Sequence, residues 1–251
     1  MNWFLNHYFD EGPGIPKDAP RPEGLRLLAS TFGREWWELL KLNLLFLAFC
    51  LPVVTLPAAY YAMVRISLTM IEDRNVYLWR DFWSAFRSRF WMTTALGILF
   101  AGGEALALLA ARTYAQASLD QIAFSAPLAV SVTVAVLLPL YAAHLFVARA
   151  LGEDRSFSGL AKAAAIGLLA RPLPGIAALG FVALLWLAHI LFYPASALLP
   201  VLVNFSLGAL VTSFAVLEGV RHGLSVTGPA LNPKQQEDRK QSAEFPIRRM
   251  K

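Results

Sequence analysis

Four polar side chains lie inside long apolar stretches of this 251-residue sequence, where a charged or hydrogen-bonding group is costly to bury. They are Glu104, His144, His189 and Asn204. A carboxyl or imidazole group in such a position can carry a proton or bind an ion, so the four residues, together with Thr55 in the first span, form a candidate intramembrane polar site. The alternative is structural: Glu104 is neutral and hydrogen-bonded, and each histidine bonds a backbone carbonyl of a neighbouring helix.

Few sequence motifs point to catalysis or metal binding. The sequence contains no Walker A loop, no HExxH or GxSxG motif and no paired metal-ligand spacing. Its single cysteine, Cys50, excludes disulfide scaffolds and cysteine metal clusters. We therefore expect no catalytic residues, no enzyme activity, no metal and no cofactor.

The elements that must position these side chains are apolar stretches separated by charged connections. Hydrophobic residues make up 57% of the chain and charged residues 16%. Because a helix needs about 20 residues to cross the hydrocarbon core, five spans are predicted, at about 42–64, 91–111, 122–148, 174–193 and 197–218. The sequence thus predicts an all-α fold, a polytopic transmembrane helical bundle over 42–220. It is preceded by a segment with an interfacial helix (1–41) and followed by a disordered basic tail (221–251).

Lys and Arg are distributed unevenly among the connections. The segments that follow the five spans carry five, one, four, none and seven of them, in chain order. Since positive residues favour the cytoplasm, the first and third connections and the C-terminus are predicted to be cytoplasmic, in a bacterial cell membrane. Five spans then leave the N-terminus outside. Five cations in residues 1–41 oppose this, and a re-entrant first helix that turns at Pro52 and Pro57 would instead keep the N-terminus inside.

Two cytoplasmic helices are predicted, over about 77–90 and 156–169. The first combines an aromatic face with neighbouring arginines, in Trp79, Arg80, Phe82, Trp83, Phe86 and Arg87. Such helices are typical of the membrane interface, so this surface is expected to contact lipid or a protein partner. Each helix follows a Glu-Asp-Arg tripeptide (72–74 and 153–155) whose acids are expected to cap it. The repeated order favours a parallel internal repeat, although one tripeptide match can be coincidence.

Pro52 and Pro57 interrupt the first span, and each removes a backbone donor from the helix. Thr55 can compensate by bonding back to the carbonyl of Leu51. The break is either a packing kink, which is common in membrane helices, or a discontinuous helix whose free carbonyls line a ligand or ion path.

Short motifs surround this break: Leu42-Asn43-Leu44-Leu45, Pro52-Val53-Val54-Thr55, Tyr60-Tyr61, Asp81-Phe82-Trp83 and Phe86-Arg87. Together they resemble the YesL family of bacterial membrane proteins over about residues 12–90, with Leu56-Pro57 where many members have a glycine. That family is a domain of unknown function, whose members often lie beside genes for carbohydrate ABC importers and glycan-degrading enzymes. The resemblance implies an accessory role around sugar uptake, and it brings no functional residues with it.

The leading hypothesis is a non-enzymatic accessory or regulator of ABC-type carbohydrate uptake, acting on a partner through the two cytoplasmic helices. The alternative is a small oligomeric transporter whose path lies at the Pro52/Pro57 break and Glu104. An intramembrane enzyme lacks a nucleophile–base arrangement. Expected partners are the lipid bilayer, ABC importer subunits and further copies of the chain. Nucleic acid is not expected, because the cytoplasmic connections already explain the net charge of +5.

Overall fold

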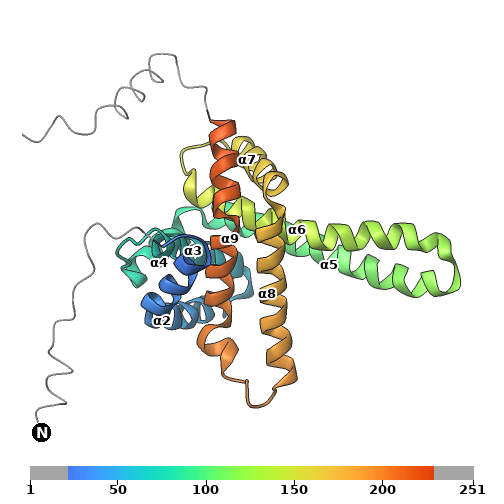
Figure 1. The fold of residues 1–251 in the computed structure, drawn as a ribbon, viewed down its shortest axis with the longest axis horizontal. Coiled ribbons are helices and arrows are strands. Elements are labelled where there is room, and N and C mark those ends of the chain that lie inside the picture. The colour runs from blue at the N-terminus through green and yellow to red at the C-terminus, as the bar shows by residue number, and fades with distance from the viewer. Residues whose placement is uncertain (1–21, 229–251) are drawn as a thin grey trace, which may run out of the picture.

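The computed structural model describes residues 22–228, and within them the chain is entirely helical apart from short connections (Figure 1). The α-helices are α2 (Gly24–Phe49), α3 (Leu56–Ile71), α4 (Leu78–Ser88), α5 (Phe90–Asp120), α6 (Ser125–Leu151), α7 (Phe157–Ala170), α8 (Pro172–Leu191) and α9 (Phe205–Thr227). Two 3₁₀ turns, η1 (Val53–Thr55) and η2 (Ile122–Phe124), precede α3 and α6. A π-helical turn, η3 (Pro200–Asn204), leads into α9. The predicted all-α fold is confirmed for these residues.

Five helical stretches are long and apolar enough to cross a membrane, which agrees with the predicted multi-pass membrane protein. They are Val53–Ile71, Phe90–Asp120, Ile122–Leu151, Pro172–Leu191 and Pro200–Thr227. The tightly packed stretches are Val53–Ile71 and Pro200–Thr227, because 61% and 50% of their most apolar windows are buried within the protein. The other three are at most 11% buried and present their apolar side chains outwards.

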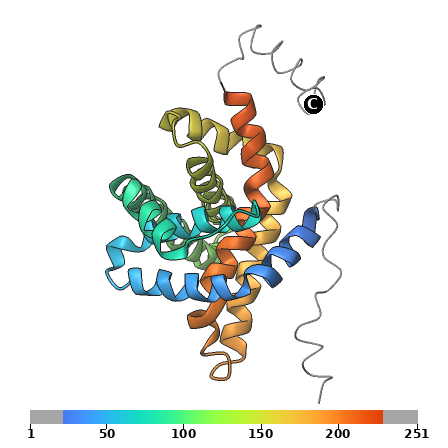
Figure 2. The same ribbon diagram turned by 90° about the vertical axis from the view of Figure 1, so that its left-hand side faces the viewer.

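The helices surround α9. In Figure 1, α8 and α9 run side by side, and the α5–α6 hairpin projects to one side of them. Figure 2 shows α2 and α3 crossing α9. The apolar core is formed by α3 together with parts of α2, α4, α6, α7 and α9.

The predicted single span over 42–64 is wrong. Helix α2 ends at Phe49 and a new helix begins at Leu56, so the chain turns between them. Pro52 precedes the 3₁₀ turn, whereas Pro57 occupies the first turn of α3, where proline costs no helical hydrogen bond. The hydroxyl of Thr55 donates to the carbonyls of Phe49 and Pro52 rather than to that of Leu51. There is therefore one break, stabilised from within the turn.

Two further boundaries differ from the prediction. Helix α2 runs without interruption across the expected boundary at residue 42, and α9 continues to Thr227, so residues 221–227 are helical. The remaining parts of the predicted terminal segments, 1–21 and 229–251, lie outside the described residues.

The turn at the prolines brings the start of the described chain beside the C-terminal half of α9. Glu23 at the start of α2 and Arg74 just after α3 line the same cavity as Arg171 before α8 and Arg221 near the end of α9. Five spans with the N-terminus outside would place the start of α2 and the end of α9 on opposite faces. The geometry favours the alternative in which the chain turns at Pro52 and Pro57.

This arrangement predicts a labelling pattern. In a Cys50→Ser background, cysteines placed at Glu23, Asn75 and Ser158 should be protected from impermeant thiol reagents in intact cells. A cysteine at Ser118, at the end of the α5–α6 hairpin, should react. Permeabilised cells, in which all four should react, provide the control. Labelling at Glu23 together with Ser118 would instead support an external N-terminus, and labelling at Asn75 without Ser118 would invert the whole arrangement.

The two Glu-Asp-Arg segments occupy equivalent places in the order of helices. The first joins α3 to α4 and α5, and the second joins α6 to α7 and α8. An arginine, Arg89 or Arg171, then separates the short helix from the long one in each series, with φ angles of −143° and −140°. The predicted capping role is wrong, however. Ser156 caps α7 by accepting from the Gly159 amide, and Asp81 accepts from the amide of Tyr77 at the start of α4.

Helices α7 and α9 approach each other closely through glycines. A Cβ on Gly167 would lie 2.5 Å from the carbonyl oxygen of Gly219. One turn further along α9, a Cβ on Gly223 would overlap the backbone of Ala163. Small residues permit this backbone contact, which fixes α7, the second of the predicted cytoplasmic helices, against α9.

Candidate functional site

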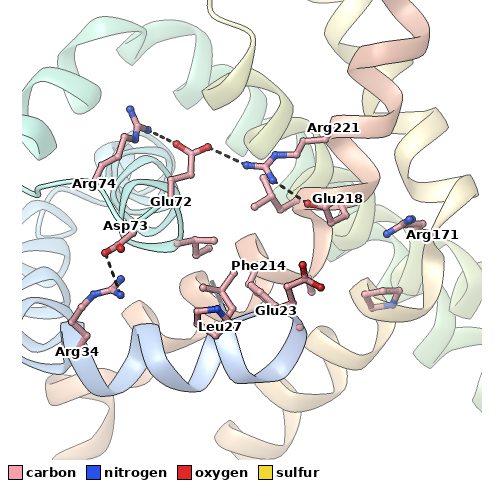
Figure 3. A pocket seen from close by; sticks show the side chains of 16 residues that line it. Glu23, Leu27, Arg34, Glu72, Asp73, Arg74, Arg171, Phe214, Glu218 and Arg221 are labelled. Carbon is pink, nitrogen blue, oxygen red and sulfur yellow. Dashed lines mark hydrogen bonds and ion pairs between the residues drawn. The ribbon is translucent and has the colours of Figure 1, made fainter. Parts of the chain in front are cut away.

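A cavity of about 820 Å³ lies between the start of α2, the end of α3, the start of α8 and the C-terminal half of α9. Figure 3 shows the charged side chains that line it. Four are basic and four acidic: Arg34, Arg74, Arg171, Arg221, Glu23, Glu72, Asp73 and Glu218. The lining is therefore rich in charge and formally neutral.

Ion pairs connect the helices around this cavity. Arg34 on α2 lies 3.2 Å from the carboxylate of Asp73, which follows α3 in a left-handed conformation with φ 57°. Glu72 accepts from Arg74 at 2.7 Å and from Arg221 at 3.2 Å (Figure 3). The partly exposed pairs each contribute little energy. Their effect is to fix the ends of α2, α3 and α9 relative to one another.

The second Glu-Asp-Arg segment adjoins the first. Glu153 forms an ion pair with Arg65 of α3, and its backbone carbonyl accepts from Arg149 at 3.3 Å. Arg155 donates to the carbonyl of Leu224 on α9 at 2.8 Å. A smaller cavity of about 400 Å³ is lined by residues of both segments. The two copies of the tripeptide thus form one charged surface.

Sequence reasoning missed this surface, because it assigned the tripeptide acids to helix capping. One sequence feature could have indicated it. Glu218 and Arg221 lie three residues apart, directly after the apolar run of α9, and they form an ion pair. The hydrogen bond from Arg221 to Glu72 depends on the packing of α3 against α9, which a local sequence pattern does not indicate.

Glu104 lies in a separate cavity of about 330 Å³, where the α5–α6 hairpin meets α3, α8 and α9. One carboxylate oxygen of Glu104 is buried without a hydrogen-bond partner among the described residues. Tyr60 and Thr212 line the same cavity. Neither Pro52 nor Pro57 belongs to its lining, so the structure does not bring the predicted helix break to Glu104.

The other predicted polar residues do not converge on Glu104. His144 is fully buried against Gly175 and Gly219, and its Nδ1 lies 2.8 Å from the carbonyl of Leu140. His189 is bonded to Ser196 in the turn after α8, with Nδ1 3.1 Å from the Ser196 carbonyl. Asn204 is buried, and both amide atoms lack a partner among the described residues. The four residues therefore do not form one site.

Asn43, in the middle of α2, makes the most extensive polar contact across the core. Its amide nitrogen donates to the carbonyls of Pro200 and Val201, at 2.9 and 2.7 Å. Its oxygen accepts from the amides of Phe205 and Ser206, both at 3.0 Å. The fully buried Asn43 thus bonds backbone groups of the π-helical turn and of the first residues of α9. Asn43 had been noted only as part of a motif.

The aromatic face of α4 is divided between the core and the surface. Phe82 and Phe86 are buried, so these two residues are not available to lipid or to a partner. Trp79 and Trp83 are 65% and 40% exposed, and their rings are parallel with centroids 6.4 Å apart. Phe49, at the end of α2, packs beneath all four rings at centroid distances of 5.0–6.1 Å.

The arginines of α4 lie beside these rings. The guanidinium of Arg87 is 5.5 Å from the centroid of Trp83, and that of Arg80 is 4.3 Å from the ring of Tyr77. Arg80 also pairs with Asp81 at 3.0 Å. The exposed surface of α4 is therefore formed by Trp79, Arg80, Trp83 and Arg87.

No group of three His, Cys, Asp or Glu side chains within residues 22–228 is placed to hold a metal ion. What the described residues do present is a charged end surface, a small cavity with one carboxylate, and an aromatic and basic helix face.

A family model described as "Protein of unknown function, DUF624" matches residues 39–110. The match covers the end of α2, the proline break, α3, α4 and most of α5. No curated protein and no solved structure matches the chain. Since DUF624 contains the YesL-like membrane proteins, the resemblance predicted from the motifs around Asn43, Pro52 and Phe82 is confirmed over residues 39–110.

Proposed function

We propose that the protein is a non-enzymatic accessory or regulatory component of ABC-type carbohydrate uptake in a bacterial cytoplasmic membrane, with its C-terminus in the cytoplasm. The family to which residues 39–110 are matched has no assigned activity. The resemblance to YesL-like proteins supports an accessory role in carbohydrate uptake. The charge distribution of the connections supports a cytoplasmic position for α4 and α7.

The observation that carries the proposal is the exposed surface of α4. Trp and Arg are the residues enriched in the energetic centres of protein interfaces, and here Trp79, Trp83 and Arg87 are held together on a short helix. Phe49 and the buried Phe82 fix this helix from below, so little side-chain entropy is lost when a partner binds. Helix α7, by contrast, is held against α9 and contributes less free surface.

The test is co-purification in mild detergent from cells that express a carbohydrate ABC importer. Importer subunits should be recovered with the wild-type protein in a fixed ratio, and Trp83→Ala should reduce their recovery by about tenfold or more, as expected for a central interface residue. Trp37→Ala provides a matched control, because Trp37 is 59% exposed on α2, outside this surface.

Other outcomes identify the alternatives. If Arg80→Glu/Arg87→Glu reduces quenching of tryptophan by lipid-borne quenchers while Trp83→Ala leaves subunit recovery unchanged, α4 is seated on lipid and the proposal fails. Sugar uptake by the purified protein alone in liposomes would replace it with the transporter hypothesis, in which Glu104 and its cavity become the first residues to examine.

A further inference from the structure

The charged cavity continues into an apolar groove. The groove has a volume of about 550 Å³ and lies between α2, α8 and α9. Its walls are apolar side chains, among them Leu28, Phe32, Ala177, Phe181 and Val211. Pro174, Phe214 and Ala215 line both the cavity and the groove. The two therefore form one continuous depression with a charged end and an apolar end.

The length of the groove fits an acyl chain of one membrane leaflet. The groove begins near Arg171 and runs along α8 from Pro174 to Phe181, seven residues or about 10 Å. The antiparallel stretch of α9 runs from Ala215 to Leu207 along the same groove. One leaflet supplies about half of the roughly 30 Å hydrocarbon core. A groove of this length accommodates most of an acyl chain that enters from the charged end.

The charges at the mouth indicate the headgroup. The ion pairs described above involve Arg34, Glu72, Asp73, Arg74, Glu218 and Arg221. Arg171 and Glu23 line the same cavity, yet neither makes an ion pair with another described residue (Figure 3). A guanidinium is suited to a phosphate, and a carboxylate to an ammonium group. This cation and anion together complement a headgroup that carries both.

We propose that the depression binds one aminophospholipid, with its phosphate at Arg171, its ammonium group at Glu23 and an acyl chain in the groove between α2, α8 and α9. The bound lipid contacts the N-terminal half of α2 and the α8–α9 pair at the same time. The inference does not depend on a role in sugar uptake, because no residue of α4 lines the cavity or the groove.

The test uses the full-length purified protein, stripped of lipid in detergent and titrated with phosphatidylethanolamine, phosphatidylcholine or phosphatidylglycerol under native mass spectrometry. One phosphatidylethanolamine should bind with at least about tenfold preference over the other two, which reflects a charge-assisted hydrogen bond at each end of the headgroup. Glu23→Gln should remove this preference, and Arg171→Glu should weaken the binding of all three lipids, because each carries the phosphate. Arg112→Glu, which changes an exposed arginine on α5, should leave both the preference and the binding unchanged.

Filling the groove tests the acyl-chain site separately. Ala177 is exposed and lines the groove, so Ala177→Trp should block the chain without disturbing the core. Ala129→Trp, at an exposed position on α6, is the matched control. With thermal midpoints equal to wild type, loss of the bound phospholipid in Ala177→Trp alone supports the proposal. Unchanged binding in Ala177→Trp, or a preference for phosphatidylglycerol in the wild-type protein, overturns it.

Discussion

The Asn43→Leu protein is expected to lose about 2–6 kcal/mol of unfolding free energy, because four hydrogen bonds to backbone groups disappear together and each is worth about 0.5–1.5 kcal/mol. Leucine is similar in size to asparagine, so the loss reports the unpaired groups of Pro200, Val201, Phe205 and Ser206 more than a change in packing. Denaturant unfolding in detergent, followed by circular dichroism, measures it.

Asn204→Leu is the matched control. Asn204 is as buried as Asn43, but its amide has no hydrogen-bond partner among the described residues, so removing it should be neutral or stabilising. Equal destabilisation by the two substitutions would show that Asn43 does not hold the start of α9.

Gly223→Ala is expected to destabilise the protein by about 1–3 kcal/mol or more, since the added methyl group overlaps the backbone of Ala163, which cannot rotate away. The helices α7 and α9 must separate to admit it. Because α9 also lies beside α3, the change should lower the thermal midpoint of the whole protein and not only the stability of α7.

Gly180→Ala separates this clash from the general effect of replacing a helical glycine. Gly180 lies within α8, and a Cβ there meets no atom within 4 Å. Alanine should therefore be neutral or stabilise the protein by about 0.4–1 kcal/mol, because it restricts the unfolded chain. If both substitutions shift the midpoint in the same direction, the α7–α9 contact is looser than the structure shows.

The sequence indicated the helices well where long apolar runs end at charges. The expected 91–111 falls within α5, and the expected 77–90 and 156–169 are close to α4 and α7. It failed at the first span because apolar composition continues through Pro52, so hydropathy alone cannot locate a turn there. Only the proline chemistry suggested one, and it suggested a second break at Pro57 that the first turn of α3 does not require.

The sites were harder to predict because they depend on contacts between distant segments. The rule that intramembrane polar residues mark function drew attention to Glu104 and His144, yet it gave no means of pairing them with neighbours. Asn43 and the Glu-Asp-Arg segments acquire their roles from residues more than 60 positions away, such as Pro200, Arg221 and Leu224. Periodicity describes one helix at a time and does not report such pairings.

The packing of α3 against α9 has a consequence for biosynthesis. Helix α3 is the first of the five apolar stretches to leave the ribosome, and α9 is the last. Throughout synthesis α3 therefore lacks one of the neighbours that bury it in the finished protein. The side chains that it buries in the finished protein are nevertheless mostly apolar, among them Ala62, Met63, Val64 and Ile66, and lipid solvates such side chains as readily as protein does. During synthesis these side chains of α3 can therefore contact lipid. When α9 is inserted, it packs against α3 and displaces the lipid acyl chains.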